Sequence, residues 1–414
     1  MASISNPLST SRTAGAAQGW TLASANWLAT MATAVLAPIL PKIAEYFHTD
    51  PHVAVMVALV ATLPAFFVAV CAWPSGLLCD RFGTRRIMLF GVGIYGFVGC
   101  APMILNSLMG IVITRAMVGI TEAVILTCTT ALVADYYPFN EREKWLALQT
   151  GGAGVVAVVM VALGGLLGTG GWRAPFAMYC VAFILFFLCL FKTWEPPEHV
   201  SMRALREQTE DPRAGQPLAA KKKYRWAPVG WICLLTFFAG TAFFIMIIQL
   251  SFILAERNVT EPAKVGLGCA AAVLFMPIGS ALFTVVRLPV AGRLTLSFIL
   301  SAVGFFVLAL ARGFFPTEVG AAINGLGSGL ALPTLITWAL AKMTPEVRAR
   351  GTGFWQSSFF LGQFVSPLAV LALKNITGSL GNAVLVYAFF MSVAAVVAII
   401  AYIRGGSQPL VEAL

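Results

Sequence analysis

The sequence predicts an all-α polytopic membrane protein, with 12 transmembrane helices in two pseudo-symmetric six-helix bundles. Three observations predict this fold class. Of the 414 residues, 59% are hydrophobic and 11% are charged, whereas a soluble protein carries about 25% charged residues. The apolar residues fall in runs long enough to cross a bilayer, which takes about 20 residues per helix. One charged segment divides these runs into two sets of six.

The first six runs form the expected N-terminal bundle, residues 18–193. Polar or charged turns separate them, so each run can cross the bilayer once. The runs cover residues 22–40, 53–79, 87–105, 108–137, 145–168 and 172–191. The segment 194–225 carries prolines, alternating charges and three consecutive lysines. It is typical of a solvated linker, and we expect a short amphipathic helix around residues 200–208.

The next six runs form the expected C-terminal bundle, residues 226–404, between the linker and a tail at 405–414. They cover residues 226–254, 264–286, 294–311, 317–341, 351–373 and 382–403. A short pattern repeats about half a chain apart: Asp135 and Lys342 each stand three residues before a proline, and two basic residues and a glutamine follow. Duplicated halves of this kind build many transporters, with the substrate site between them.

Orientation follows from the basic residues, which accumulate in cytoplasmic loops. Most of the 27 lysines and arginines fall in the tails, the linker and the turns on one side. We therefore expect a multi-pass protein of the cytoplasmic (inner) membrane with both termini, including the tail 1–17, in the cytoplasm. No small-residue cleavage site follows a short apolar core, so the first helix is expected to be retained. Nothing indicates an obligate oligomer, and we expect a monomer in the lipid bilayer.

The turn between the second and third runs is unusually rich in charge and glycine. It reads Gly76-Leu77-Leu78-Cys79-Asp80-Arg81-Phe82-Gly83-Thr84-Arg85-Arg86. This segment resembles the loop between helices 2 and 3 of the major facilitator superfamily. The resemblance covers nearly the whole chain, including the start of the sixth run at Gly171-Trp172-Arg173 and Gly353-Phe354-Trp355-Gln356 in the eleventh.

The resemblance implies a cytoplasmic latch between the two halves. Asp80 would cap the N-terminus of helix 11 near Gly351–Gly353, where the helix dipole favours an anion. The arginines would bind an acid at the end of helix 4, with Asp135 the candidate. Thr84 occupies a usual basic position, for which Arg85 would substitute. The alternative is plain positive-inside charge. The latch residues are Gly76, Asp80, Arg81, Gly83, Arg85, Arg86 and Asp135.

Two ionisable residues, Arg115 and Glu122, sit deep in the fourth run. They are seven residues apart, so they share one helical stripe at a distance of roughly 10 Å along the axis. Desolvation favours the protonated form of such an acid and a nearby guanidinium opposes it, so Glu122 is the candidate proton carrier. The alternative is a static ion pair between helices. The Arg115-x-x-x-Gly119 spacing resembles the family's fourth-helix motif, whose arginine is associated with proton coupling or substrate charge.

Polar residues within the runs either line a cavity or bond between helices. We select eight as tentative cavity residues, the one at 324 lying in a glycine-broken tenth helix: Asn26, Thr30, Thr241, Gln249, Asn324, Gln356, Ser357 and Gln363. One buried charge pair among amides, hydroxyls and aromatic rings suits a small amphipathic organic molecule. A polyanion would require several arginines in the cavity.

These residues predict a proton-coupled secondary active transporter that works by rocker-switch alternating access. The family's proton-driven exporters carry a Gly-Pro-x-x-Gly-Gly element in helix 5, and this chain has only its Gly164-Gly165. Export by H⁺ antiport is slightly favoured. The alternative is H⁺ symport uptake of an organic nutrient, an organic acid or a siderophore-like metal chelate.

Other function classes find little support in the residues. A membrane enzyme is a distant alternative, because no nucleophile–base pair or metal-ligand spacing is present and the three histidines lie outside the spans. No phosphate-cradling loop suggests ATP as the energy source. We expect no cofactor, since a proton gradient supplies the energy, and neither a metal site nor nucleic-acid binding.

Overall fold

The computed structural model describes residues 14–196, 226–343 and 345–404, with only the backbone described for Asp80, Phe139, Asn140, Glu143, 345–350 and Arg404. All regular structure in these ranges is helical. Twelve helices, some built from two to four segments, are long and apolar enough to span a membrane, which confirms the expected number. Most of the linker and both tails lie outside the described residues, as does the helix expected around 200–208.

The N-terminal half contains six spans, four of which include a short 3₁₀ segment. The first span consists of α1 (Ala16–Asn26), α2 (Leu28–Ala34), η1 (Ala37–Ile39) and α3 (Leu40–Tyr46). The next three are α4 (Val53–Phe82), α5 (Thr84–Cys100) with η2 (Ala101–Met103), and α6 (Leu108–Tyr136). The last two are α7 (Phe139–Leu167) with η3 (Gly168–Gly170), and η4 (Ala174–Cys180) with α8 (Val181–Lys192).

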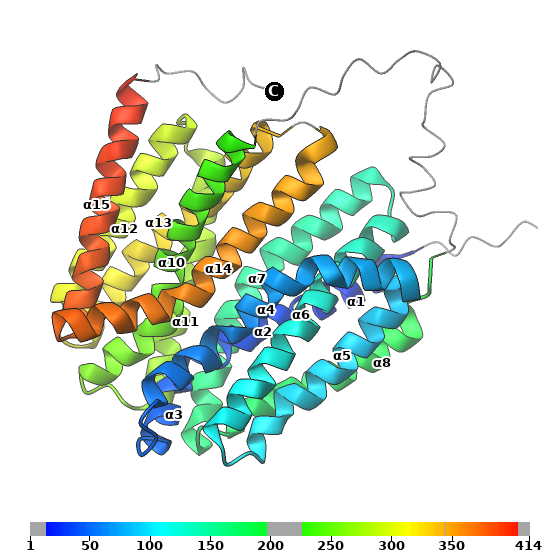
Figure 1. The fold of residues 1–414 in the computed structure, drawn as a ribbon, viewed down its shortest axis with the longest axis horizontal. Coiled ribbons are helices and arrows are strands. Elements are labelled where there is room, and N and C mark those ends of the chain that lie inside the picture. Colours follow the sequence, from blue (N-terminus) through cyan, green and yellow to red (C-terminus); the bar gives the residue numbers. More distant parts are fainter. Residues whose placement is uncertain (1–13, 197–225, 344, 405–414) are drawn as a thin grey trace, which may run out of the picture.

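The C-terminal half contains six helices, each in one uninterrupted segment. They are α10 (Ala227–Glu256), α11 (Pro262–Val285), α12 (Val290–Leu310), α13 (Phe314–Ala341), α14 (Pro345–Thr377) and α15 (Leu380–Arg404). Figure 1 shows the blue-to-green N-terminal half beside the green-to-red C-terminal half. Each half is built around its own cluster of buried apolar side chains.

The tenth span differs from its expected form. We expected its glycines to break it, but α13 is one continuous helix through Gly325, Gly327 and Gly329. A Cβ atom at Gly327 would lie 2.6 Å from the Ser301 hydroxyl oxygen, and one at Gly329 would lie 2.1 Å from the Met276 carbonyl oxygen. The glycines therefore serve close packing of α13 against α12 and α11, as small residues do between membrane helices.

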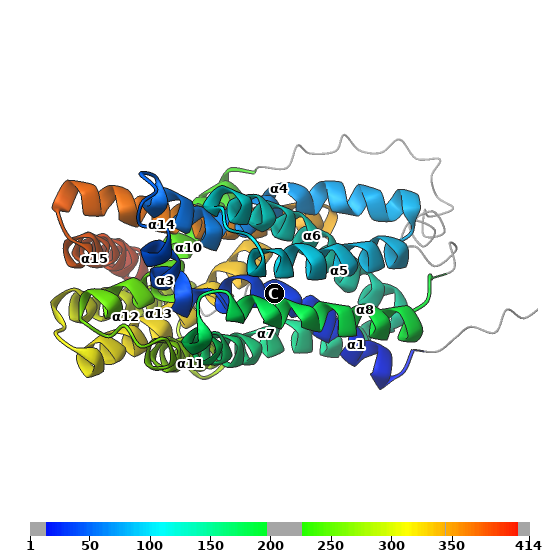
Figure 2. The ribbon, with the colours of Figure 1, turned by 90° about the horizontal axis from the view of Figure 1, so that it is seen from below.

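The two halves meet most extensively along two pairs of helices, α7 with α11 and α4 with α14, and the η1–α3 part of the first span also contacts α10 and α11. In both views, α7 lies beside α11 (Figures 1 and 2). A Cβ atom at Gly165 would lie 2.4 Å from the Cα of Gly266, so the two backbones touch. Between α4 and α14, the rings of Phe66 and Phe364 are 5.0 Å apart. Contacts at both pairs tie the two cores into one body.

Close packing inside the N-terminal half yields a stability prediction. A Cβ atom at Gly119 of α6 would lie 2.4 Å from the Pro64 carbonyl oxygen of α4, whereas one at Gly151 of α7 would meet nothing within 4 Å. We expect Gly119→Val to lower the free energy of unfolding by about 1–3 kcal/mol, since overpacking forces the two backbones apart. Gly151→Val, a matched glycine on an open helix face, should leave the thermal midpoint of the purified protein near that of wild type. Equal midpoints for the two variants would contradict the packing.

Candidate functional site

The guanidinium of Arg115 lies at the centre of the N-terminal half and is 0% exposed. Its Nη1 donates a hydrogen bond to the Tyr179 hydroxyl oxygen at 2.7 Å. Its Cζ lies 5.0 Å from the centre of the Tyr179 ring and 5.4 Å from that of Phe176. These rings come from η4, so the sixth span supplies both a hydrogen bond and aromatic faces that stabilise a desolvated cation.

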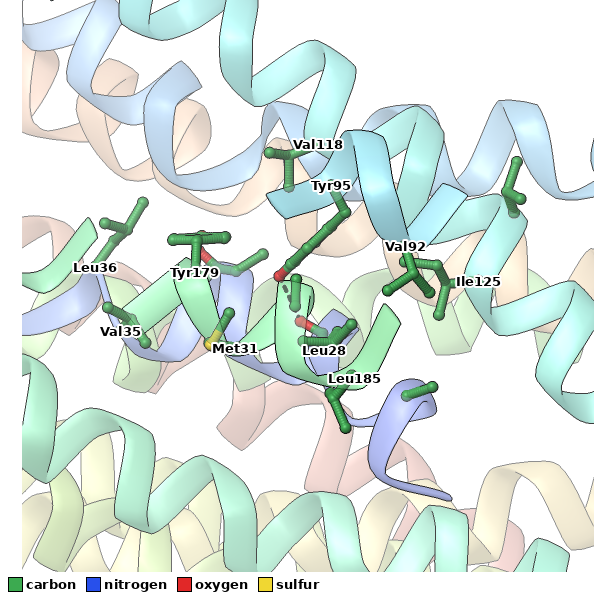
Figure 3. Packing of buried hydrophobic residues seen from close by; sticks show 14 of the residues in the cluster. Leu28, Met31, Val35, Leu36, Val92, Tyr95, Val118, Ile125, Tyr179 and Leu185 are labelled. Carbon is green, nitrogen blue, oxygen red and sulfur yellow. Dashed lines mark hydrogen bonds between the residues drawn. The ribbon is translucent and has the colours of Figure 1, made fainter. Parts of the chain in front are cut away.

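Two tyrosines attach the first span to this site. Tyr95 and Tyr179 have ring centres 5.4 Å apart. The Tyr95 hydroxyl donates to the Leu28 carbonyl oxygen at 2.6 Å, and the Tyr179 hydroxyl donates to the Ala32 carbonyl oxygen at 3.3 Å. Figure 3 shows Tyr95 and Tyr179 around the Leu28–Leu36 segment. A carbonyl oxygen has two lone pairs and can accept such an extra bond, so α2 is fixed directly over the buried charge.

Glu122 lies two turns beyond Arg115 on α6 and is 4% exposed. The positive charge of Arg115 is close enough to interact electrostatically with the Glu122 carboxyl. No ion pair with an N···O distance within 4 Å joins the two residues in the part of the chain that the structure describes. The Oε1 of Glu122 and the Nε and Nη2 of Arg115 are buried without a hydrogen-bond partner among the described residues. Such atoms are rare and costly in native structures. The pair is therefore not a closed ion pair and retains free bonding capacity.

The expected latch segment has a definite structure inside the N-terminal half. Gly83 ends α4 and precedes α5 with φ of 93°, a conformation that favours glycine. The Arg85 side chain donates to the carbonyl oxygens of Leu190 and Thr193 at 2.8 and 2.9 Å, and so caps the C-terminus of α8. The Glu195 carboxylate accepts the backbone N–H groups of Arg85 and Arg86 at 3.2 and 3.3 Å. It thereby caps the N-terminus of α5.

The contact expected between the latch arginines and Asp135 is not among the described interactions. Arg81 lies over the neighbouring Phe82 ring at 5.3 Å, and Arg86 is exposed. Asp135 interacts electrostatically with a different basic residue, Arg142.

The contact expected between the latch and the N-terminus of helix 11 can be followed only in part among the described residues. Helix α14 begins at Pro345, so Gly351–Gly353 lie inside the helix and not at its N-terminus. The Asp80 side chain lies outside the described residues. A Cβ atom at Gly76 or at Gly353 would meet nothing within 4 Å.

A second tyrosine pair joins helix ends near the expected cytoplasmic side. The Tyr137 hydroxyl donates to the Gly15 carbonyl oxygen at 2.7 Å, and burial raises the pKa of Tyr137 to about 12. It therefore remains a donor at neutral pH. The neighbouring Tyr136 ring stacks on Trp194 with centres 4.6 Å apart. The beginning of the first span and the end of the sixth are thus both tied to the end of α6.

The eight tentative cavity residues separate into two groups. Two of them reach across the halves from α14: Gln363 donates to the Thr33 hydroxyl at 3.1 Å, and Ser357 donates to the Ala69 carbonyl oxygen at 3.3 Å. The other six bond within one half or have no described side-chain hydrogen bond. Asn26 donates to Thr129, Asn324 to Ser301 and Thr241 to Phe238, while Gln249 is buried, Thr30 half-buried and Gln356 exposed.

Three residues at or near the site were not selected from the sequence. Tyr95 and Tyr179 occur in apolar runs and carry no local motif, and Glu195 stands at the start of the linker. Glu318 in α13 was also missed, although both of its carboxylate oxygens are buried. Glu318 could have been identified from the sequence, because it is a single acid in an otherwise uncharged run.

The family follows from a sequence profile described as Major Facilitator Superfamily, which matches residues 22–367. The chain belongs to the Major Facilitator Superfamily. Solved structures agree on the fold. A bacterial homolog of the human lysosomal transporter Spinster, in an inward-facing and occupied conformation, is 14% identical and has a TM-score of 0.75 over 92% of this chain and 96% of that one. The xylose transporter XylE from E. coli is 15% identical with a TM-score of 0.67 over 90% and 94%.

Curated relatives of this superfamily member match over shorter stretches. The class H tetracycline resistance protein of Pasteurella multocida is 27% identical over 183 residues, which is 42% of this chain and 44% of that protein. The probable anion transporter 4 of Arabidopsis thaliana chloroplasts is 31% identical over 117 residues, or 28% and 22%. The matches thus span less than half of each of these relatives. They are transporters and not enzymes.

The enclosure of Arg115 predicts unequal effects of removing the two site hydroxyls. Tyr179→Phe leaves a buried cation without its hydrogen bond, and a bond to a charged group contributes about 1.5–3 kcal/mol. Tyr95→Phe removes a neutral bond to a carbonyl, which contributes about 0.5–1.5 kcal/mol. Thermal unfolding of the purified variants should therefore show the larger loss for Tyr179→Phe. A larger loss for Tyr95→Phe would mean that Tyr179 does not stabilise the charge.

Proposed function

We propose that the protein is a proton-coupled secondary active transporter of a small amphipathic organic molecule, working by rocker-switch alternating access. The observation that supports this most is the pair Arg115 and Glu122. Both are enclosed in the N-terminal half, and three of their polar atoms have no partner among the described residues. A carboxyl in such a place binds a proton reversibly, because desolvation opposes its charge and the guanidinium favours it.

The proposed cycle uses the change of charge on Glu122. With the proton bound, the carboxyl is neutral and Arg115 holds the only net charge at the site. When the proton leaves, the carboxylate and the guanidinium attract each other along α6. This attraction changes the forces on the hydrogen bonds that join Arg115 to Tyr179 and Tyr179 to the first span. Since Tyr95 and Tyr179 bond to Leu28 and Ala32, proton exchange would shift the first span relative to α6.

Export by H⁺ antiport is the favoured direction. Resistance proteins for tetracycline and quinolones are among the relatives. One observation favours the alternative, H⁺ symport uptake of an organic nutrient, an organic acid or a metal chelate: the Gly-Pro part of the exporter element in helix 5 is replaced by Met160-Val161. Relatives named as inorganic phosphate cotransporters and anion transporters are consistent with uptake. We also propose that both termini face the cytoplasm.

A metabolite comparison decides between the two directions. Small molecules would be measured by mass spectrometry in cells with and without the protein, each with and without a protonophore. Antiport predicts a compound depleted in the expressing cells, with the depletion lost on uncoupling. Symport predicts a compound enriched under the same test. A difference that survives the protonophore would contradict proton coupling.

Glu122→Gln should abolish proton-driven transport of that compound in proteoliposomes, down to the level of protein-free liposomes. The amide keeps the size of the side chain but cannot bind and release a proton. Exchange of labelled for unlabelled compound without a gradient should persist, because it needs no net proton movement. Glu256→Gln, which removes an acid from the exposed ion pair with Lys374, is the matched control and should retain driven transport. Driven transport by Glu122→Gln at the wild-type rate would refute the assignment.

The latch remains a proposal that substitution can test. Asp80→Asn should slow turnover several-fold without weakening substrate binding, because the latch would act on the conformational change and not on the substrate site. Asp50→Asn, in the turn before α4 where Asp50 accepts the His52 N–H at 2.8 Å, is the control on the opposite face. Normal turnover for Asp80→Asn would leave positive-inside charge as the sole role of the segment.

A further inference from the structure

A second enclosed carboxyl lies in the C-terminal half, apart from Arg115 and Glu122. Glu318 stands in the second turn of α13, a helix that crosses the membrane and has no other charged residue. Both of its carboxylate oxygens are buried and have no hydrogen-bond partner among the described residues. A Cβ atom at Gly268 of α11 would lie 2.5 Å from the Glu318 Oε1 and 3.0 Å from the Phe314 ring. The carboxyl therefore packs closely against α11 at Gly268.

The charged groups near Glu318 make their described contacts with other residues and not with its carboxyl. On α11, the Lys264 ammonium lies 5.3 Å from the centre of the Phe314 ring, and Cys269 is a buried free thiol. At the end of α10, Arg257 donates to the Thr317 hydroxyl and the Leu308 carbonyl, and Glu256 pairs with Lys374. On α12 the one charged residue, Arg293, donates to the Val286 carbonyl at 3.0 Å near the opposite end of the helix.

An ionised carboxylate in these surroundings would be desolvated without compensation, and such a group binds a proton instead. The helix dipole offers little relief, because its effect falls off within the first turn. Glu318 lies just past that turn. The neutral acid is therefore the form that the enclosure accommodates.

The helix that covers Glu318 also forms the contact between the halves. Gly266, two residues before Gly268, touches Gly165 of α7: a Cβ atom at Gly266 would lie 2.5 Å from the Gly165 Cα. Pro262, four residues earlier, contacts the Gly168 position at the end of α7. Positions two residues apart lie on nearly opposite faces of a helix, so α7 supports α11 on the side away from Glu318. When the halves separate here, this segment of α11 loses that support and is free to move away from α13, which would give water a path to the carboxyl.

We propose that Glu318 is a second proton-binding site, which holds its proton while α11 packs against α7 and releases it to water on the outward side when that contact opens. On release the O–H bond breaks, the proton passes to water and the carboxylate remains. That Glu318 binds a proton does not depend on the function proposed above. That the release follows separation of the halves rests on alternating access.

Infrared spectroscopy of the full-length protein in lipid tests the first part. The carbonyl band of a protonated carboxylic acid is absent from carboxylates and amides. At neutral pH, Glu318→Gln should remove such a band, in the wild-type background and in a Glu122→Gln background alike. The isosteric amide keeps the packing, which an unchanged elution profile in size-exclusion chromatography would verify. An unchanged band in both backgrounds would overturn the site.

A wedge between the halves tests the second part. Gly165→Trp places a large side chain where the α11 backbone now touches α7, whereas Gly151→Trp places it on an open face of the same helix. The Glu318 band should disappear at neutral pH in Gly165→Trp and persist in Gly151→Trp. If Gly165→Trp does not fold, Gly266→Trp approaches the same contact from α11. Persistence of the band in a folded wedge variant would refute the coupling. Failure of the transport assay with Glu122→Gln would affect neither infrared result.

Discussion

The burial of the Arg115 guanidinium is the interaction on which most of the N-terminal half depends. A charge inside a membrane span is costly unless it is paired or enclosed by polar and aromatic groups, so the helices around it must supply bonds and aromatic faces. The sixth span supplies Tyr179 and Phe176. The Tyr179 hydroxyl also donates a hydrogen bond to the Ala32 carbonyl oxygen. The Tyr95 hydroxyl donates to the Leu28 carbonyl oxygen, one turn earlier in the first span. One cation thereby fixes spans 1, 3, 4 and 6 relative to one another.

Glycine has the complementary role at the boundary between the halves. The backbones of α7 and α11 touch at Gly165 and Gly266, where no side chain intervenes. Van der Waals contact of this kind is a main attraction between helices in lipid, because apolar side chains gain nothing from leaving an equally apolar solvent. The polar bridges of Gln363 to Thr33 and Ser357 to Ala69 add direction without closing a salt bridge. Such a boundary is compact and can still be opened.

The twelve spans were predictable from apolar length, because the bilayer imposes it. The superfamily was predictable from the Gly76–Arg86 segment, which resembles a loop of that family. Arg115 and Glu122 were found because a charge within an apolar run is conspicuous. Tyr95 and Tyr179 were not found, because a tyrosine among phenylalanines does not reveal its role until the fold shows what its hydroxyl contacts. The continuity of α13 was mispredicted because glycine weakens an isolated helix, whereas here tertiary packing against Ser301 and Met276 uses its small size. The capping of α5 by Glu195 joins positions over 100 residues apart, which no local pattern reveals.

The Gly165–Gly266 contact lies near one end of α7, because Gly165 is two residues before the last residue, Leu167, and far from the first, Phe139. A point of touching backbones so close to one end acts as the fulcrum of an unequal lever. At 1.5 Å per residue, Phe139 lies about 39 Å from it along the helix, so each degree of rotation moves that end by about 0.7 Å. The short arm moves by only a small part of that. A modest tilt about the closed contact would thus open the long-arm side widely, whereas the short-arm side opens only when the two backbones themselves separate.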